Sequence, residues 1–274
     1  MSDLTVTQSL VEQVVDLAHR AGRAILEVYE SPDLGVEYKA DESPLTRADL
    51  ASNRVITAGL AQLTPPVPIL SEEAKQLPYE KRRSWNQFWL VDPLDGTKEF
   101  IKRNGEFTVN IALVEAGEPV AGVVHSPVLG TTYWAARGIG AFKIKADGEE
   151  VPIRAGTANA NTFKAVASRS HAGPETEGFL ERLGQIKPVE TTSSGSSLKL
   201  CLVAEGSADL YPRYGPTMEW DTGAAHAVVT QAGGSVTDLK GVPLQYNKEN
   251  LLNPYFVVLG DFAPELRSQV LQIL

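Results

Sequence analysis

Two carboxylates and a hydroxyl stand directly after an apolar run that predicts a buried strand. The run 88–91 ends in Asp92, and Asp95 and Thr97 follow within five residues. At a separation of ~5 Å and an effective dielectric of ~20, two carboxylates repel each other by roughly 3 kcal/mol. A divalent cation would turn this repulsion into attraction, and the main-chain carbonyl of Leu94 could face the same ion. Oxygen ligands of this kind suit Mg²⁺, although an Asp-Gly turn between two strands is the plain alternative.

Three further carboxylates stand at the ends of predicted elements. Glu72 follows the short apolar run 67–70, and Asp221 begins an apolar helix rich in small residues. Asp49 stands near the start of a helix predicted over about 51–63, with Thr46 as its N-cap. Asp49 and Asp221 could each be ordinary helix-capping residues. If the strands before Glu72 and Asp92 are neighbours, however, these carboxylates converge.

Carboxylates without a cluster of His or Cys favour Mg²⁺ and phosphate chemistry. Two or three ions would neutralise a phosphate and activate a water for in-line attack. Thr97 could pass a proton to Asp49, and this pair would orient and deprotonate the water. Phosphatases that form an aspartyl-phosphate use Asp-x-Asp-x-Thr, but here the spacing from Asp92 to Asp95 is one residue too long.

Composition indicates an ordinary globular protein. The chain has 274 residues, of which 43% are hydrophobic and 22% charged. Cys201 is the only cysteine, which excludes an intrachain disulfide and fits a reducing cytoplasm. We expect no signal peptide and no transmembrane segment, and contact with a membrane surface stays open. The net charge of −9 argues against binding to a nucleic-acid polymer.

The order of the predicted elements indicates a layered α/β fold. Apolar spacing predicts a helix over 7–29, and the first half continues with strands at hairpin spacing (107–114, 119–125, 130–136 and 141–144). The second half alternates strands (164–168, 187–190, 208–213 and 255–259) with helices (174–183, 198–204 and one from Asp221). We expect it to continue the first sheet. The basic run 81–83 is predicted to be a solvated face.

Several separated motifs resemble the inositol monophosphatase superfamily of lithium-sensitive, Mg²⁺-dependent phosphatases. They are Asp-Pro-Leu-Asp-Gly-Thr (92–97), Ser-Glu-Glu (71–73) and Trp-Asp-Thr-Gly-Ala-Ala (220–225). The extended stretch 90–103 and the tetrapeptide 168–171 resemble the 3'(2'),5'-bisphosphate nucleotidases of the CysQ type. The similarity covers about 10–259. It implies an αβαβα sandwich, an α/β (α+β layered) fold. We expect one catalytic unit, residues 1–274, in which an α+β part (about 1–150) and an α/β part (about 151–274) share the active site.

The resemblance also implies roles for individual residues. The metal ligands would be Glu72, Asp92, the Leu94 carbonyl, Asp95 and Asp221, and the water-activating pair would be Thr97 and Asp49. Substrate contacts would come from the ligands Glu72, Leu94, Asp95 and Asp221, from the backbone amides of Gly96 and Thr97, and from Ser168, His171, Gly195, Lys199 and Arg213. Lys199 and Arg213 supply cations for a second phosphate, unless they are only surface or helix-terminal charges.

The activity implied is removal of the 3'-phosphate of adenosine 3',5'-bisphosphate to leave AMP, in support of sulfate assimilation. The sulfated nucleotide is a related candidate substrate, and lithium inhibition is expected. The alternatives are a phosphatase for inositol monophosphate or fructose 1,6-bisphosphate, and a non-catalytic sensor of Mg²⁺ or phosphate ligands. The protein would act as a monomer or a homodimer.

Overall fold

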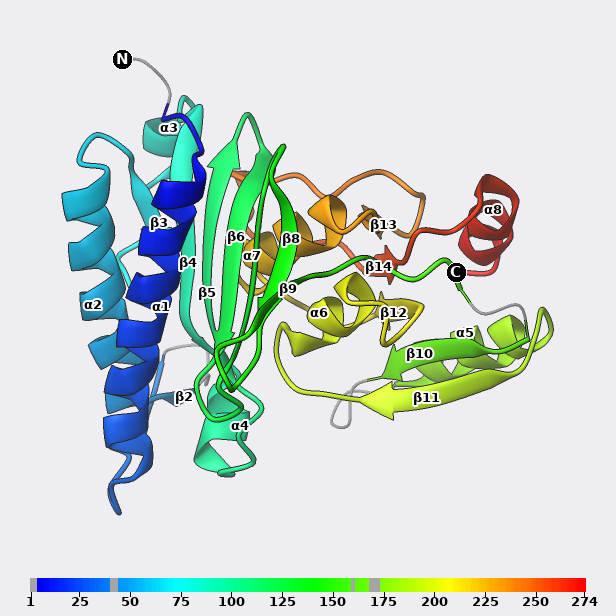
Figure 1. Ribbon diagram of the computed structural model, residues 1–274, viewed down its shortest axis with the longest axis horizontal. Helices are drawn as coiled ribbons and strands as arrows, with labels where there is room; N and C mark the ends of the chain where they lie inside the picture. Colours follow the sequence, from blue (N-terminus) through cyan, green and yellow to red (C-terminus); the bar gives the residue numbers. More distant parts are fainter. Residues whose placement is uncertain (1–3, 40–43, 159–160, 168–172) are drawn as a thin grey trace.

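The protein forms five layers of alternating helices and sheets. The computed structural model describes all residues except 1–3, 40–43, 159–160 and 168–172. In Figure 1, helices α1 and α2 cover a large sheet, and α6 and α7 lie between this sheet and a second one. Helices α5 and α8 cover the far face of the second sheet. The predicted αβαβα sandwich is therefore confirmed.

The first sheet has seven strands in the order β3-β4-β5-β6-β7-β8-β9. Strands β3 and β4 are parallel, and all later pairs are antiparallel, as the hairpin spacing predicts. The strands are β3 (Ile69–Ser71), β4 (Gln87–Asp95), β5 (Thr108–Glu115), β6 (Glu118–Ser126), β7 (Thr131–Ala136), β8 (Gly140–Ile144) and β9 (Glu150–Pro152). A separate two-stranded sheet joins β1 (Glu37–Tyr38) and β2 (Pro44–Leu45).

The second half does not continue the first sheet, so this expectation is wrong. It forms a separate five-stranded sheet in the order β11-β10-β12-β14-β13. The strands are β10 (Phe163–Ala167), β11 (Val189–Ser193), β12 (Leu210–Arg213), β13 (Ser235–Asp238) and β14 (Phe256–Leu259). The separation follows from α7 (Glu219–Gln231), which contacts both sheets and is buried on nearly all sides. A helix that is apolar all round must be covered on all its faces.

The helices lie at the predicted positions in the chain, and their bounds differ from the predicted bounds mainly at the first residue. They are α1 (Gln8–Tyr29), α2 (Arg47–Leu63), α5 (Pro174–Gly184), α6 (Leu198–Ala204) and α8 (Pro264–Gln272), with short turns α3 (Tyr79–Arg82) and α4 (Thr97–Ile101). Helix α2 begins four residues earlier than expected because Thr46 and Asp49 form a capping box at its first turn.

The basic run 81–83 is not wholly a solvated face. Arg82 is 3% exposed. Its guanidinium donates to Asn247 Oδ1 and to the carbonyls of Lys248 and Glu249 at 2.6–2.9 Å. A guanidinium with several fixed acceptors can be buried where an isolated charge cannot. Arg82 therefore ties α3 to the loop before β14.

Close packing of α7 on the first sheet depends on small residues on both sides. A Cβ added at Gly122 on β6 would lie 2.2 Å from the carbonyl oxygen of Ala224 on α7. A Cβ at Gly223 would lie 2.8 Å from a methyl of Leu90 on β4. Helix α7 thus sits unusually near β4 and β6, which brings its first turn to the end of β4.

We expect Gly122→Ala to lower the free energy of unfolding by about 1–3 kcal/mol, because its new methyl must displace the backbone of α7. Urea denaturation followed by circular dichroism measures this change. Gly184→Ala is the matched control, since no atom lies within 4 Å of a Cβ there. Equal stability of both variants would contradict the close packing of α7 on β6.

Candidate active site

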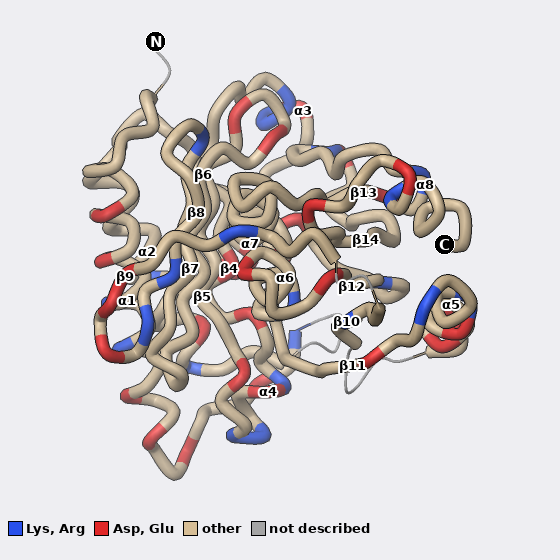
Figure 2. Tube along the Cα trace, turned by 45° about the vertical axis from the view of Figure 1, so that its right-hand side comes forward, with Lys and Arg blue, Asp and Glu red and all other residues tan. Residues whose placement is uncertain are grey.

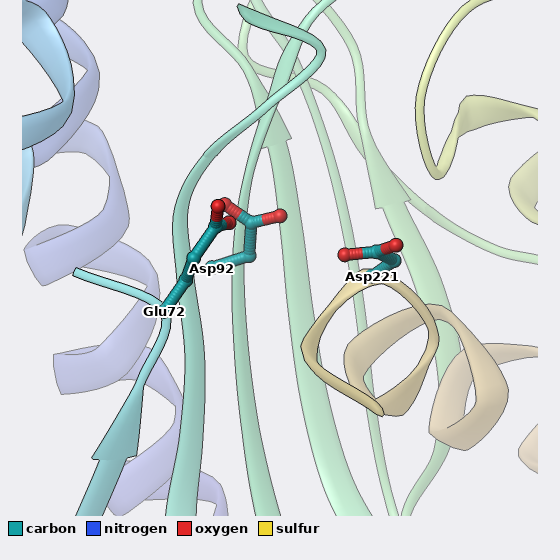
Figure 3. A group of neighbouring side chains, drawn as sticks. All are labelled: Glu72, Asp92 and Asp221. Carbon is teal, nitrogen blue, oxygen red and sulfur yellow. The ribbon is translucent and has the colours of Figure 1, made fainter. Parts of the chain in front are cut away.

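Three carboxylates converge where β3, β4 and α7 meet. Glu72, Asp92 and Asp221 each place a carboxylate oxygen within 4.8 Å of the other two (Figure 3). Because β3 and β4 are parallel neighbours, Glu72 and Asp92 leave the sheet at the same edge. Asp221 reaches them from the first turn of α7. The predicted convergence of the separated acidic segments is what the structure shows.

The charge of this group is costly without a cation. Burial raises the pKa of Asp92 and of Asp221 well above the usual range, and the neighbouring carboxylates raise both further. Burial also raises the pKa of Glu72, with Glu73 and Asp95 adding to the effect of burial. Acidic oxygen donors that repel each other in a buried place fit a hard divalent cation. These residues could therefore hold a metal ion.

The backbone between Asp92 and Asp95 leaves the regular strand. The register of β4 with β5 shifts between these two residues. Asp92 Oδ1 accepts a hydrogen bond from the Leu94 N–H at 3.0 Å, and Gly96 takes a left-handed φ of 94° before α4. The turn thereby brings Asp95 beside the cluster, and its charge raises the pKa of Glu72, Asp92 and Asp221.

The predicted pair of Thr97 and Asp49 is in contact. Thr97 Oγ1 donates to Asp49 Oδ1 at 3.3 Å, and it also lies 3.5 Å from the Leu94 carbonyl oxygen. Asp49 Oδ2 accepts from the backbone N–H of Thr46 at 2.7 Å, so Asp49 caps α2 as well. Burial raises the pKa of Asp49. The Asp49 carboxylate therefore caps α2 and accepts the hydrogen bond from Thr97 at the same time.

A cleft beside the carboxylates contains most of the predicted substrate contacts. Asp95, Gly96, Gly195, Lys199, Arg213 and Asp221 all line it, together with Glu99, Lys102, Glu106 and Tyr211. Its walls come from α4 and the end of β4 on one side and from α6 and β12 on the other. Ser168 and His171 lie outside the described residues.

Of the three Lys and Arg residues that line the cleft in the described part of the chain, Lys199 and Arg213 lie on α6 and β12, and Lys102 follows α4. Lys199 is 9% exposed and its Nζ lies 5.8 Å from the centre of the Tyr211 ring. Burial lowers the pKa of Lys199, and the nearby charge of Arg213 adds to this. Arg213 donates to the Pro216 carbonyl at 3.1 Å, while its Nε has no partner among the described residues. Two neighbouring cations, one of them with an unpartnered donor in the described part of the chain, suit an anionic ligand.

Sequence reasoning missed three residues that contact the converging carboxylates or Asp95. Lys39 Nζ lies 2.8 Å from Glu72 and 2.6 Å from Glu73. Asn110 on β5 lies 3.5 Å from Asp95, and Ser197 donates its backbone N–H to Asp95 at 2.7 Å. Of the three, only Asn110 could have been suspected from the sequence, because it is a polar residue inside an apolar strand. Contacts across strands and layers leave no spacing pattern in the sequence.

Positive charge elsewhere is dispersed. Figure 2 shows Lys and Arg scattered along the trace and mixed with Asp and Glu, without a basic stripe in the described part. No helix among the described residues is both long and apolar enough to cross a membrane.

Comparison with known proteins identifies the class. The chain belongs to the inositol monophosphatase family, whose model matches residues 7–269. The predicted family is therefore confirmed, and with it the metal-dependent phosphatase class.

Among its relatives, the chain is similar to 3'(2'),5'-bisphosphate nucleotidase CysQ of Escherichia coli strain K12. The two are 52% identical over 253 residues, which is 91% of this chain and 99% of the relative. The enzyme of the same name from Haemophilus influenzae is 39% identical over 268 residues, covering 97% of this chain and 98% of the relative.

Solved structures agree with this assignment. The crystal structure of CysQ from Bacteroides thetaiotaomicron matches with a TM-score of 0.82 and 47% identity, covering 93% of this chain and 98% of that one. SuhB from Bartonella henselae matches with a TM-score of 0.79 at 24% identity, covering 97% and 98%, which supports the fold alone.

We expect stabilisation by Mg²⁺ to decrease as the pH is lowered. Metal binding needs ionised carboxylates, and those of Asp92, Asp221 and Glu72 keep their protons to higher pH than usual. Without metal, carboxyl groups with raised pKa values lower the free energy of unfolding as the pH rises through those values, because the folded protein must then hold buried charges. The stabilisation by Mg²⁺, which offsets these charges, is therefore largest at high pH. Melting temperatures with Mg²⁺ and with EDTA at each pH measure the difference. A pH-independent shift would contradict metal binding by these carboxylates.

Proposed function

We propose that this protein is a Mg²⁺-dependent 3'(2'),5'-bisphosphate nucleotidase that converts adenosine 3',5'-bisphosphate to AMP and phosphate. One observation carries the proposal: Asp221 of the carboxylate cluster, together with Asp95 and Gly96, lines a cleft that also contains the buried Lys199 and the partly buried Arg213. A phosphatase for a single phosphate needs the carboxylates, whereas the cations of the cleft suit a substrate with a second phosphate. The names of the similar enzymes support the same activity.

The carboxylates would hold the Mg²⁺ ions, and the ions would hold the phosphate group that is removed. Glu72, Asp92, Asp95, Asp221 and the carbonyl of Leu94 are the proposed ligands of two or three Mg²⁺ ions. When bound, the ions would neutralise the phosphate and lower the pKa of the attacking water. The backbone N–H groups of Gly96 and Thr97 stand at the start of α4, where the helix dipole favours an anion.

Thr97 and Asp49 would act on the attacking water. Thr97 Oγ1 accepts a hydrogen bond from the water while it donates its own proton to Asp49 Oδ1. Because burial raises the pKa of Asp49, this carboxylate is a stronger base than an exposed one. As the water oxygen attacks phosphorus, the bond from phosphorus to the ribose 3'-oxygen breaks on the opposite side. The leaving 3'-oxygen takes up a proton from solvent, and Asp49 returns the proton of the attacking water to solvent.

The cations of the cleft would hold the rest of the nucleotide. Lys199 and Arg213 would pair with the 5'-phosphate, since they are positive groups on the opposite wall of the cleft from α4. Gly195 lies in the turn between β11 and α6 and lines the same cleft. Ser168 and His171 complete the proposed contacts with the nucleotide. On this account the parts 1–150 and 151–274 form one catalytic unit, because each supplies one wall.

The enzyme would clear an inhibitory by-product of sulfate assimilation. The sulfated nucleotide, which carries the same 3'-phosphate, is a second proposed substrate. Lithium sensitivity follows from the family resemblance. Whether the protein works as a monomer or a homodimer does not alter this chemistry, because both walls of the cleft belong to one chain.

We expect faster phosphate release from adenosine 3',5'-bisphosphate than from inositol monophosphate or fructose 1,6-bisphosphate. Inositol monophosphate has no second phosphate for Lys199 and Arg213, and fructose 1,6-bisphosphate has a second phosphate but no nucleoside for the other proposed contacts. A phosphate-release assay at equal substrate concentrations, with Mg²⁺ present, compares the three. Preference for either sugar phosphate would contradict the proposal in favour of the corresponding phosphatase.

Asp95→Asn is the control that separates an enzyme from a sensor. The variant should stay folded and lose turnover by about a thousandfold or more, since a ligand charge and a substrate contact are removed together. A wild-type protein that binds Mg²⁺ and nucleotide without releasing phosphate would be a sensor.

A further inference from the structure

Ser197 joins the second half of the chain to the carboxylate of Asp95. Its backbone N–H donates to Asp95 Oδ2 at 2.7 Å, and its hydroxyl oxygen lies 3.0 Å from the same atom. The preceding residue, Ser196, donates its hydroxyl to the Asp95 carbonyl oxygen at 2.8 Å. One turn, between β11 and α6, therefore holds Asp95 at both its main chain and its side chain.

The direction of the Ser197 hydroxyl is set by two residues on β5. Thr108 Oγ1 donates to Asn110 Oδ1 at 3.1 Å, which turns Asn110 Nδ2 toward Ser197. Asn110 Nδ2 then donates to Ser197 Oγ at 2.8 Å. Since Ser197 Oγ accepts this bond, its single proton is left for an acceptor on the other side.

Two acceptors compete for that proton. One is Asp95 Oδ2 at 3.0 Å, and the other is the Asp221 carbonyl oxygen at 2.8 Å. A hydrogen bond to an ionised carboxylate is about twice as strong as a bond between neutral groups. The carboxylate oxygen of Asp95 is therefore the favoured acceptor.

We infer that Ser197 is a positioning residue for the metal site and acts through Asp95. Its two donors occupy Oδ2 and fix the plane of the carboxylate, so that Oδ1 is the oxygen left for a cation. Burial strengthens this effect, because Ser197 is 1% exposed and no water competes for the bonds. The inference rests on the proposed role of Asp95 as a metal ligand, but not on which phosphate ester is the substrate.

Titration calorimetry with Mg²⁺ alone tests the inference without any substrate. In Ser197→Ala the backbone N–H is kept and only the hydroxyl is lost. We expect Kd for Mg²⁺ to rise by about tenfold, which is the usual effect of losing one hydrogen bond to a charged group. Ser194→Ala is the matched control, because Ser194 lines the same cleft without a hydrogen bond to Asp95. Its Kd should equal that of the wild type.

A double-mutant cycle identifies the group through which the hydroxyl acts. Unfolding by urea in EDTA is measured for wild type, Ser197→Ala, Asp95→Asn and the double variant. A bond to the carboxylate predicts that Ser197→Ala destabilises the wild type more than it destabilises Asp95→Asn. Equal effects in both backgrounds would mean that the hydroxyl serves only the Asp221 carbonyl and would overturn the inference.

The outcomes also separate this inference from the proposed function. If the wild type binds Mg²⁺ and Ser197→Ala binds it equally well, the positioning role is wrong while the metal site stands. If the wild type itself binds no Mg²⁺, the proposed cofactor is wrong. If Mg²⁺ binding responds to Ser197 but the nucleotide is not cleaved, only the proposed substrate fails.

Discussion

The repulsion among Glu72, Asp92 and Asp221 is the constraint on which the site depends. Each pair of these carboxylates has oxygens within 4.8 Å, which corresponds to a repulsion of about 3 kcal/mol per ionised pair at an effective dielectric of ~20. The sandwich maintains this arrangement because β3 and β4 run in parallel and α7 packs closely on the first sheet through Gly122. Lys39 offsets part of the charge at Glu72. The remainder is a strong driving force for binding a divalent cation.

The two sheets supply different parts of the chemistry. The first sheet, α2 and α4 contribute most of the carboxylates and the Thr97–Asp49 pair, while α6 and β12 contribute Lys199 and Arg213. Ser196 and Ser197 connect these parts directly at Asp95. Asp95, a proposed metal ligand, is thus held by the segment that forms the opposite wall of the cleft. We expect metal binding and the position of that wall to be coupled for this reason.

Much of the architecture could be predicted because it follows local patterns. Apolar periodicity gave the helix over 7–29, and hairpin spacing gave the antiparallel strands after Asp95. The converging carboxylates could be found because each stands at one end of an apolar element. Contacts between distant segments could not be found, as Lys39, Arg82 and Ser197 illustrate, since each gains its partners only when separate layers pack together. The split into two sheets was missed because whether strands share a sheet is decided by the helices packed between them.

The most direct test of the account is the stability of Asp221→Asn with and without Mg²⁺, measured by urea unfolding. Asn keeps the oxygen that accepts the Met218 N–H at 2.9 Å but removes one of the three repelling charges. The account predicts that in EDTA the variant is more stable than the wild type, by about 1 kcal/mol or more, and that Mg²⁺ stabilises it far less. Glu190→Gln, an exposed change of the same kind, should do neither. A less stable Asp221→Asn that Mg²⁺ still stabilises like the wild type would contradict the central claim.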